Sequence, residues 1–245
     1  LRWDFLVLAT AMRVLLRLCV TAACLYVAIA AGLYIFQERL IFLGEPLDKN
    51  FKFSFENSEF AGVVNVPEND EHLDTPSSAT QNSAAANGTA AIKFQEINIP
   101  FEGGLINGLK FSAAEPKGAI LFFHGNFGDV SGWGAYGADF AALGYDFYIF
   151  DYPGYGKSDG KISSQQQLFA SADAMSRYVL AQHSPKKLAM IGYSIGSGIA
   201  AQQAAKWDAA RLILLAPYFS FERLAHEKIP FVPKFLIRYK IPTAE

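Results

Sequence analysis

The sequence predicts an α/β protein with a mostly parallel central sheet, and three observations favour this class. Near-continuous apolar runs at 119–123, 147–150 and 212–216 are typical of strands buried on both faces. The stretches between such runs carry apolar residues at helical spacing, so strand and helix alternate along the chain. Glycine-containing loops follow several of the strands, at the edge where the carboxyl ends of parallel strands meet. We therefore expect one sheet with helices on both faces.

The hydrophobic residues of the chain are concentrated at its front. The 245 residues suffice for one domain and an appendage, and 51% of them are hydrophobic. The net charge of −2 gives no electrostatic reason to expect nucleic acid as a partner. Residues 18–36 contain no charged side chain, and at about 1.5 Å per residue they match the thickness of a bilayer's hydrocarbon core. We predict a single transmembrane anchor there.

The charges around this apolar run predict its orientation. Arg2, Arg13 and Arg17 precede it and mixed charges follow it, which places the N-terminus in the cytoplasm and the rest of the chain on the periplasmic or lumenal side. A cleaved signal peptide is the competing interpretation, because residues 28–30 (Ala-Ile-Ala) resemble a cleavage site. The apolar run continues past that site to Phe36, which favours the anchor over a signal peptide, and it is too uniformly apolar for a buried soluble helix.

Cys19 and Cys24 both lie within the apolar run on different helical faces, so we expect no disulfide.

Composition divides the chain into four segments. Phe51, Phe53 and Phe55 alternate with polar residues, which predicts a short strand or an extended arm. The segments are a membrane anchor (1–40), a membrane-proximal arm (41–66), a disordered insertion poor in residues to bury (67–92), and the α/β domain (93–245).

Within the α/β domain, two strands joined by a turn at 102–104 precede the buried strands. The strand that ends at Gly192 leads into another helical pattern and then into the last buried run. The expected strands lie near 92–99, 106–111, 119–123, 147–150, 187–192 and 212–216, and the expected helices near 133–143, 163–183 and 195–207.

The motif Gly-Tyr-Ser-Ile-Gly at 192–196 stands at this strand-to-helix transition. A serine at the tip of so tight a turn requires small residues two positions before and two after it, and Gly192 and Gly196 satisfy that requirement. The first turn of the following helix directs free N–H groups toward the space above Ser194. We predict that Ser194 is a nucleophile. A chance match is the alternative in a chain with 20 glycines.

Two further loops follow buried strands. In His-Gly-Asn-Phe-Gly at 124–128, the backbone N–H of Asn126, or secondarily that of Phe127, is expected to form an oxyanion hole together with the N–H of Ile195. His124 is expected to be structural, because the end of a buried strand constrains it. The loop at 151–158 (Asp-Tyr-Pro-Gly-Tyr-Gly-Lys-Ser) is expected to turn the chain away from the site, since it lacks the spacing of a phosphate-binding loop.

These three motifs in this order resemble those of the α/β-hydrolase superfamily. The apolar run followed by Phe-Gln-Glu-Arg-Leu-Ile-Phe at 36–42 is similar to the membrane-anchored branch of serine hydrolases, which is related to acyl-protein thioesterases and described as serine aminopeptidase-like. The resemblance covers residues 34–66 and 93–245. It implies Ser194 as nucleophile, a histidine as general base, an acid that orients this histidine, and an acyl-enzyme intermediate.

The resemblance also implies that the acid and the histidine follow the next two strands, and no residue of this sequence matches those positions. The expectation is therefore a C-terminally truncated, inactive fragment of a longer hydrolase lacking its last two strands. His226, about ten residues after the last predicted strand, is the one candidate for a substitute base. A non-catalytic binding or scaffolding module and a serine peptidase remain as alternatives to an ester or thioester hydrolase acting on a small-molecule or acyl substrate. No cofactor or metal is expected.

Overall fold

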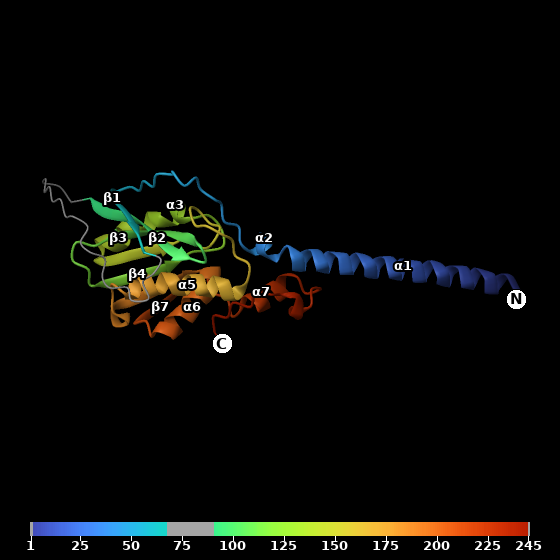
Figure 1. Cartoon of the computed structure of the whole chain (residues 1–245). Helices are drawn as coiled ribbons and strands as arrows, with labels where there is room; N and C mark the ends of the chain where they lie inside the picture. Colours follow the sequence, from blue (N-terminus) through green and yellow to red (C-terminus); the bar gives the residue numbers. More distant parts are fainter. Residues whose placement is uncertain (1, 68–90, 245) are drawn as a thin grey trace.

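A seven-stranded sheet forms the centre of the computed structural model, which describes residues 2–67 and 91–244 (Figure 1). The strand order is β1-β2-β3-β5-β4-β6-β7, with antiparallel pairing only between β2 and β3 and between β3 and β5. The predicted α/β class with a mostly parallel sheet is confirmed. The strands are β1 (Ser58–Asn65), β2 (Ile92–Phe101), β3 (Gly104–Ser112), β4 (Gly118–Phe123), β5 (Tyr145–Phe150), β6 (Leu188–Tyr193) and β7 (Arg211–Leu215).

Helices cover both faces of the sheet because side chains alternate along each buried strand. In β4, Leu121 and Phe123 join the apolar cluster formed with α5 (Gln165–Leu180) and α6 (Ile195–Trp207). Ile120 and Phe122 point the other way, into the cluster formed with α3 (Val130–Trp133) and α4 (Gly137–Ala142). Figure 1 shows α3 and the pair α5 and α6 on opposite sides of the strands.

The helix predicted over 133–143 forms as three short pieces. They are α3 (Val130–Trp133), a 3₁₀ turn η1 (Gly134–Tyr136) and α4 (Gly137–Ala142). A Cβ on Gly134 would lie 2.8 Å from the Phe55 ring, and one on Gly137 would lie 2.2 Å from the Phe111 ring. Glycine is required for this close packing, but it also weakens a continuous helix.

The strand of the arm lies after residues 51–55, for which a short strand or an extended arm is predicted. Residues 51–55 form no strand, although Phe53 is buried and packs with Phe55 and Phe94 in the core. The strand of this region is β1, which pairs in parallel with β2 and makes the second half of the arm part of the sheet. The predicted insertion falls largely on 68–90, outside the described residues, and its last residue, Ile92, begins β2.

Helix α1 (Arg2–Ile35) projects from the domain as a single long rod (Figure 1). Its part from Thr10 to Ile35 is long and apolar enough to cross a membrane, and almost all of it is exposed. A helix that packed in the core of a soluble domain would be buried, so this exposure sets α1 apart from such helices. Cys19 and Cys24 lie on it as exposed free thiols. A short helix, α2 (Gln37–Ile41), connects α1 to the arm.

The chain after the sheet returns to the base of α1. Beyond β7 come α7 (Phe221–Lys228) and a 3₁₀ turn, η3 (Lys234–Leu236). In the described part of the chain β7 is an edge strand, and Leu212, Ile213 and Leu215 on it are exposed, as expected for an apolar edge strand without a cover.

Candidate active site

Ser194 occupies a strained turn between β6 and α6. The strand ends at Tyr193, the helix begins at Ile195, and the single residue between them has φ 52° and ψ −119°. A residue with a side chain in this region of backbone space costs about 1–3 kcal/mol and persists only where its surroundings impose it. The predicted sharp bend at Ser194 is confirmed, and the half-buried side chain sits at its tip.

The two glycines of the motif are required by backbone atoms. A Cβ on Gly192 would lie 2.3 Å from the carbonyl oxygen of Gly196. A Cβ on Gly196 would lie 2.1 Å from the carbonyl oxygen of Phe123. Both clashes are with main chain, which cannot rotate away as a side chain can. The turn therefore excludes every larger residue at these positions, as the motif predicts.

Hydrogen bonds from neighbouring elements hold the turn. The Ser194 N–H donates to the carbonyl of Leu215 at the end of β7 (2.9 Å). The buried Ser197 hydroxyl donates to the carbonyls of Gly192 (3.1 Å) and Leu215 (3.3 Å). The Tyr218 hydroxyl donates to the carbonyl of Ile195 (3.0 Å). Strand β7 and the residues after it thus support the strained conformation.

The loop at 124–128 lies beside this turn. Strands β4 and β6 are parallel neighbours, and Phe123 pairs with Gly192, so both chains leave the sheet side by side. A Cβ on Gly125 would lie 3.2 Å from the Tyr193 ring, and the rings of Tyr193 and Trp133 are 5.1 Å apart. The carboxyl ends of the two strands therefore bring together the residues that the sequence places in one site.

The amides predicted to bind an oxyanion are unpaired. In residues 2–67 and 91–244, the backbone N–H groups of Asn126, Phe127 and Ile195 donate to no acceptor. The peptide group between Asn126 and Phe127 is held in place. Its carbonyl oxygen, that of Asn126, accepts hydrogen bonds from the Leu43 N–H (2.8 Å) and the Tyr155 hydroxyl (3.0 Å). Such fixed donors can stabilise negative charge that develops on a reacting carbonyl.

Several hydrogen bonds that hold the loop at 124–128 come from residues that the sequence pattern does not mark. Besides Leu43 and Tyr155, the Ile41 carbonyl accepts a hydrogen bond from the Asn126 side-chain amide (3.0 Å). The Trp133 indole N–H donates to the Phe127 carbonyl (2.9 Å). Ile41 and Leu43 lie more than 80 residues before Asn126, so no local pattern marks them. Tyr155 belongs to the glycine-rich loop at 151–158, and the tyrosines of that loop are the one local feature that could have indicated a contact with the loop at 124–128.

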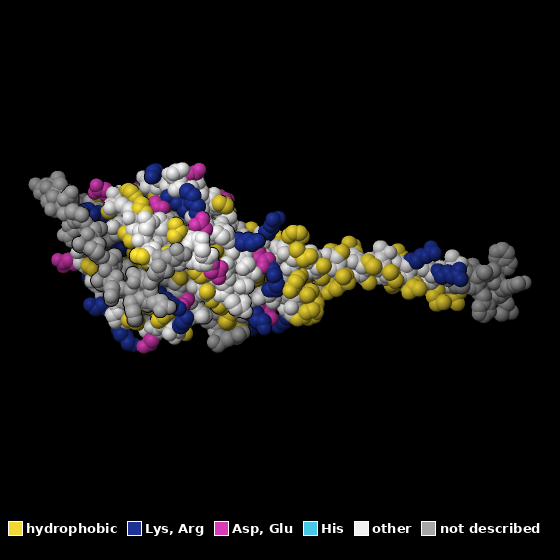
Figure 2. Space-filling view, viewed as in Figure 1, with side chains coloured by type: hydrophobic (Ala, Val, Ile, Leu, Met, Phe, Trp, Pro, Cys, Tyr) yellow, Lys and Arg dark blue, Asp and Glu magenta, His cyan; other side chains and the backbone are white. Residues whose placement is uncertain are grey.

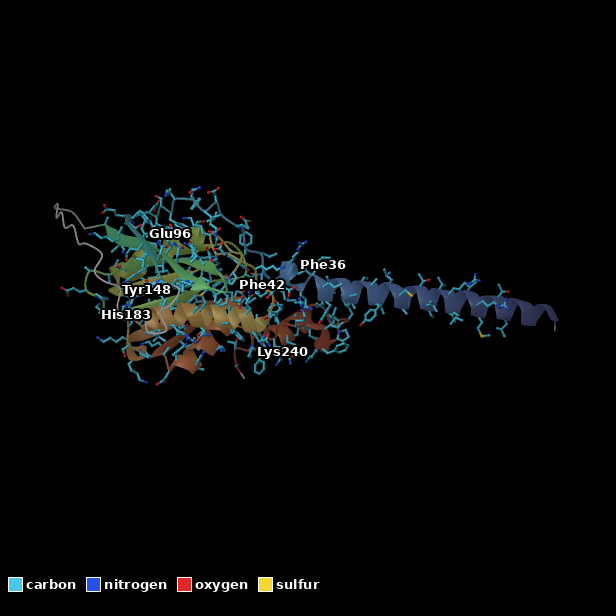
Figure 3. The ribbon with its side chains drawn as sticks, in the orientation of Figure 1. Phe36, Phe42, Glu96, Tyr148, His183 and Lys240 are labelled. Atoms are coloured by element: carbon cyan, nitrogen blue, oxygen red, sulfur yellow. The ribbon has the colours of Figure 1, made fainter. Side chains whose placement is uncertain are left out.

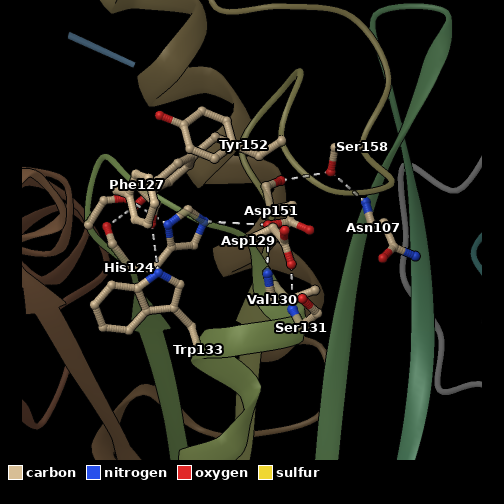
Figure 4. Close-up of polar contacts among 12 residues, drawn as sticks. Asn107, His124, Phe127, Asp129, Val130, Ser131, Trp133, Asp151, Tyr152 and Ser158 are labelled. Atoms are coloured by element: carbon tan, nitrogen blue, oxygen red, sulfur yellow. Dashed lines mark hydrogen bonds and ion pairs between the residues drawn. The ribbon is translucent and has the colours of Figure 1, made fainter. Parts of the chain in front are cut away.

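His124 is sealed beneath the site together with Asp151 (Figure 4). Its Nδ1 hydrogen-bonds the Gly125 carbonyl (2.7 Å), and burial lowers its pKa to about 4 despite that bond. Its Nε2 lies 3.7 Å from Asp151 Oδ1, too far for a hydrogen bond, and is left without a partner in the described structure. The His124 side chain is fully buried and bonded to the main chain, which agrees with the expectation that it is structural.

Asp151 is the second buried group of this pair. Its Oδ1 accepts the Val130 N–H (3.0 Å) at the start of α3, and Asp129 caps the same helix by accepting the Ser131 N–H (2.7 Å). Burial, reinforced by the nearby charge of Asp129, raises the pKa of Asp151 well above its ordinary value. A protonated Asp151 carries no charge that the buried surroundings would have to compensate.

The loop at 151–158 is occupied by internal contacts. The Tyr152 hydroxyl donates to the His124 carbonyl (2.9 Å), which complements the Tyr155 contact to Asn126. Lys157, the only cation of the loop, is buried and pairs with Glu96 (2.8 Å). The loop braces the neighbouring loop at 124–128 and leaves no free cation for a phosphate.

His226 lies apart from these residues. It sits in the last turns of α7, and its Nδ1 approaches the Val232 carbonyl at 3.2 Å. Within the described residues, no contact joins it to Ser194. The described residues also contain no group of three or more His, Cys, Asp or Glu side chains placed to hold a metal ion.

The parallel sheet, the serine at a strained strand-to-helix turn and the adjacent loop of free amides define an α/β hydrolase. Residues 114–242, more than half of the chain, match the model of the family described as serine aminopeptidase, S33, and the chain belongs to this family.

Individual relatives agree with this assignment. An uncharacterized protein of Mycobacterium tuberculosis is 32% identical over 117 residues, which cover 47% of this chain and 41% of that protein. Alpha/beta hydrolase domain-containing protein 17B of Xenopus laevis is 31% identical over 115 residues, 44% of this chain and 38% of that protein. The matches thus span about two fifths of the length of these relatives.

A solved structure supports the fold. The alpha-beta hydrolase from Vibrio vulnificus superposes with a TM-score of 0.52 at 24% sequence identity, over 61% of this chain and 57% of that chain. At this identity the likeness concerns the architecture and not the substrate.

Proposed function

We propose that the whole protein is a membrane-anchored serine hydrolase that cleaves an ester or thioester through an acyl-enzyme on Ser194. The observation that carries this proposal is the conformation of Ser194. A residue with φ 52° between two obligatory glycines, held by a hydrogen bond to Leu215, is strained for a reason other than stability. The strain projects the hydroxyl from the tip of the turn, where a substrate carbonyl can reach it.

The proposed chemistry has two steps. The Ser194 oxygen attacks the carbonyl carbon while a general base takes the hydroxyl proton, and the base returns that proton to the leaving alcohol or thiol. Water then hydrolyses the acyl-enzyme. The N–H groups of Ile195 and Asn126, with Phe127 as the alternative to Asn126, bind the oxyanion, and loss of one such donor typically costs about 2.7–4 kcal/mol of barrier.

Within residues 2–67 and 91–244, the histidines at 124, 183 and 226 are bonded to groups other than Ser194. His226 remains the candidate for a substitute base in this chain, and its contact with Val232 must break before its ring can turn toward the site. If His226 is the base, His226→Gln will abolish hydrolysis. If the base lies elsewhere in the protein, the same change will leave the rate within about twofold, because the half-buried His226 has no contact with Ser194 in the described structure.

Membrane anchoring is proposed through residues 18–36, with the N-terminus cytoplasmic and the α/β domain on the periplasmic or lumenal side. Arg13 and Arg17 before the run and the exposure of α1 support this arrangement.

Hydrolysis by the whole protein tests the proposal. Wild type, Ser194→Ala and the control Ser184→Ala are compared on short-chain aryl esters and the matching thioesters. Ser184 is an exposed serine outside the site. We expect Ser194→Ala to lower kcat/KM by at least about 10³-fold and Ser184→Ala to leave it unchanged. Equal rates for wild type and Ser194→Ala would refute the proposal.

Peptide cleavage is the second candidate reaction, because the matching family is described as serine aminopeptidase. It would use the same nucleophile and the same amides. Aminoacyl anilides assayed beside the aryl esters distinguish the two: a kcat/KM for the anilides above that for the esters would establish a peptidase.

A further inference from the structure

The chain between α7 and η3 is fastened to the outside of helix α1. The Tyr26 hydroxyl donates to the carbonyl of Phe231 (2.9 Å). The Gln37 side-chain amide donates to the carbonyl of Leu236 (2.6 Å), and its oxygen accepts the Arg238 N–H (2.9 Å). We call residues 229–237 the wedge. Three hydrogen bonds tie the wedge and the residue after it to α1 and the start of α2.

Apolar packing reinforces these hydrogen bonds. Ile229, Val232 and Leu236 of the wedge face Leu33 and Leu40 around a small apolar cavity of about 140 Å³. Val232 and Ile237 are buried there. The wedge is therefore held alongside the final turns of α1, and the medium that surrounds these turns also surrounds the wedge.

The outer side of the wedge is aromatic and exposed. Phe235 is 83% exposed and Phe231 is 56% exposed. Ile35, Phe36 and Leu40 at the base of α1 and in α2 are also exposed, so hydrophobic side chains gather where the helix meets the domain (Figure 2). Exposed aromatic groups next to further exposed apolar groups mark a surface that is covered by something other than water.

Basic residues surround this apolar surface. Lys228, Lys234, Arg238 and Lys240 are exposed, and the sequence from 228 to 240 contains no acidic residue. Arg238 is paired with Glu38, whereas the three lysines have no carboxylate partner in the described structure. Figure 2 shows Lys and Arg side chains around the base of α1, next to the hydrophobic group. An apolar tip within a ring of cations fits the acyl chains and anionic headgroups of one membrane leaflet.

The depth of the wedge follows from its contact with Tyr26. Tyr26 lies ten residues before Phe36, the end of the apolar run, which is about 15 Å along the helix. If residues 18–36 span the bilayer, as proposed above, a segment bonded to Tyr26 lies below the headgroups. Leu236 and Arg238 are bonded to Gln37, just past the end of the run, so the wedge rises from Phe231 toward the headgroups and Lys234 can place its charge among them.

We infer that the wedge inserts into the outer leaflet beside α1 and docks the domain on the bilayer. This inference rests on the proposed membrane anchor. It has a consequence for the candidate site, because α2 and residues 41–43, which bond to the loop at Asn126, lie at the same end of the domain (Figure 3, near Phe36 and Phe42). The carboxyl edge of the sheet then faces the membrane, and substrates that partition into lipid reach Ser194 most easily.

Spin-label accessibility in vesicles tests the inference on the full chain. A nitroxide is attached at Phe235→Cys or Phe231→Cys in a Cys19→Ala, Cys24→Ala background, and the protein is reconstituted in phosphatidylcholine with phosphatidylglycerol. The matched control is Leu143→Cys, an apolar position with 63% exposure after α4. A third label on native Cys24, with only Cys19→Ala, reports the anchor itself.

The ratio of collision rates with oxygen and with a water-soluble nickel complex measures whether each label is in lipid. We expect the ratio at positions 231 and 235 to exceed that at position 143 by at least about threefold, because oxygen concentrates in hydrocarbon and the nickel complex is excluded from it. A lipid-like ratio at Cys24 with water-like ratios at 231 and 235 would overturn the wedge and leave the anchor standing. Water-like ratios at all positions would overturn both.

Discussion

The two edges of the sheet are built on different principles. At the edge where the amino ends of the parallel strands lie, Asp146 is matched with partners: it accepts the Ala113 N–H (2.9 Å) and lies 3.4 Å from both Lys110 and His183. The Tyr148 hydroxyl completes this group at 2.9 Å from His183 (Figure 3). At the carboxyl edge, the structure keeps a strained Ser194, unpaired amides, and partnerless buried atoms of His124 and Asp151.

We interpret this difference as a division between an amino edge that stabilises the fold and a carboxyl edge arranged for chemistry. A paired carboxylate lowers the free energy of the folded state and requires nothing further. Strain and unpaired donors raise it, and they persist because the surrounding sheet is stable enough to tolerate them. The carboxyl edge is where an α/β protein places its chemistry. The following changes test whether the two edges differ in this way.

Gly196→Ala is expected to have the largest effect on stability. The new Cβ would lie 2.1 Å from the Phe123 carbonyl oxygen, so β4 and α6 must separate. Overpacking of this kind typically costs about 1–3 kcal/mol, and we expect the upper end because the clash is with main chain. The measurement is urea unfolding in detergent.

Gly132→Ala is the matched control for Gly196→Ala. Gly132 lies in α3, and a Cβ there would meet nothing within 4 Å. The control should be neutral or stabilising by up to about 1 kcal/mol, as helical Gly→Ala changes are. Equal losses for the two variants would contradict a turn enforced by backbone contact.

Asp146→Asn, at the amino edge of the sheet, is expected to have the next largest effect on stability. Burial by itself raises the pKa of Asp146, but the His183 hydrogen bond, the charge of Lys110 and the Ala113 N–H together lower it below its ordinary value. A carboxyl whose pKa is lowered by folding stabilises the protein above its unfolded pKa, and this contribution is lost as the pH falls through the folded pKa. We expect a loss of about 2 kcal/mol at pH 7, typical of hydrogen bonds to a charged group.

The pH dependence provides the control for Asp146→Asn. The difference between wild type and variant should shrink as the pH falls from the unfolded pKa of Asp146 toward its lower folded pKa, because the carboxyl of wild type then loses its charge. Unfolding curves measured from pH 7 to pH 3 detect this. A difference that stays constant with pH would show that Asp146 acts through packing and not through its charge.

Ser194→Gly should reveal the strain at the carboxyl edge. Glycine tolerates φ 52°, whereas Ser194→Ala keeps the strain, so the glycine variant should be the more stable of the two by about 1 kcal/mol after the entropic cost of glycine. Paired denaturation curves measure the difference. Equal or lower stability of the glycine variant would mean that the turn is relaxed.

Ser197→Ala should have the smallest effect on stability, about 1 kcal/mol for the hydrogen bonds to Gly192 and Leu215. Ser176→Ala, which removes a buried hydroxyl bonded to the Ala172 carbonyl in α5, should cost about the same. Only Ser197→Ala should also reduce kcat, because only Ser197 supports the turn. Equal kcat values for Ser197→Ala and Ser176→Ala would show that Ser197 does not support catalysis.

The sequence was sufficient wherever local sterics or burial determine the structure. Gly192 and Gly196 mark the bend because no other residue fits, and the apolar runs of β4 and β5 mark buried strands. The order of the motifs places the loop after β4 beside the turn at Ser194, because parallel neighbours end at one edge.

Long-range contacts were not predictable. Strand β1 pairs with β2 across residues 66–91, and its own pattern is too weak to show a partner. Leu43 binds Asn126, and Tyr26 binds Phe231 across 205 positions. A hydrogen bond between an ordinary side chain and a distant carbonyl leaves no trace in local periodicity, so the clamps on the site and the wedge appear only in three dimensions.

Reaction of the whole protein with a fluorophosphonate, followed by peptide mapping, tests the role of Ser194 most directly. The reagent bonds to a serine whose hydroxyl is activated, and the mass shift identifies which serine it is. We predict one adduct, on Ser194, that disappears in Ser194→Ala. An adduct on another serine, or labelling of Ser194→Ala equal to that of wild type, would contradict the assignment of the strained turn as the site of catalysis.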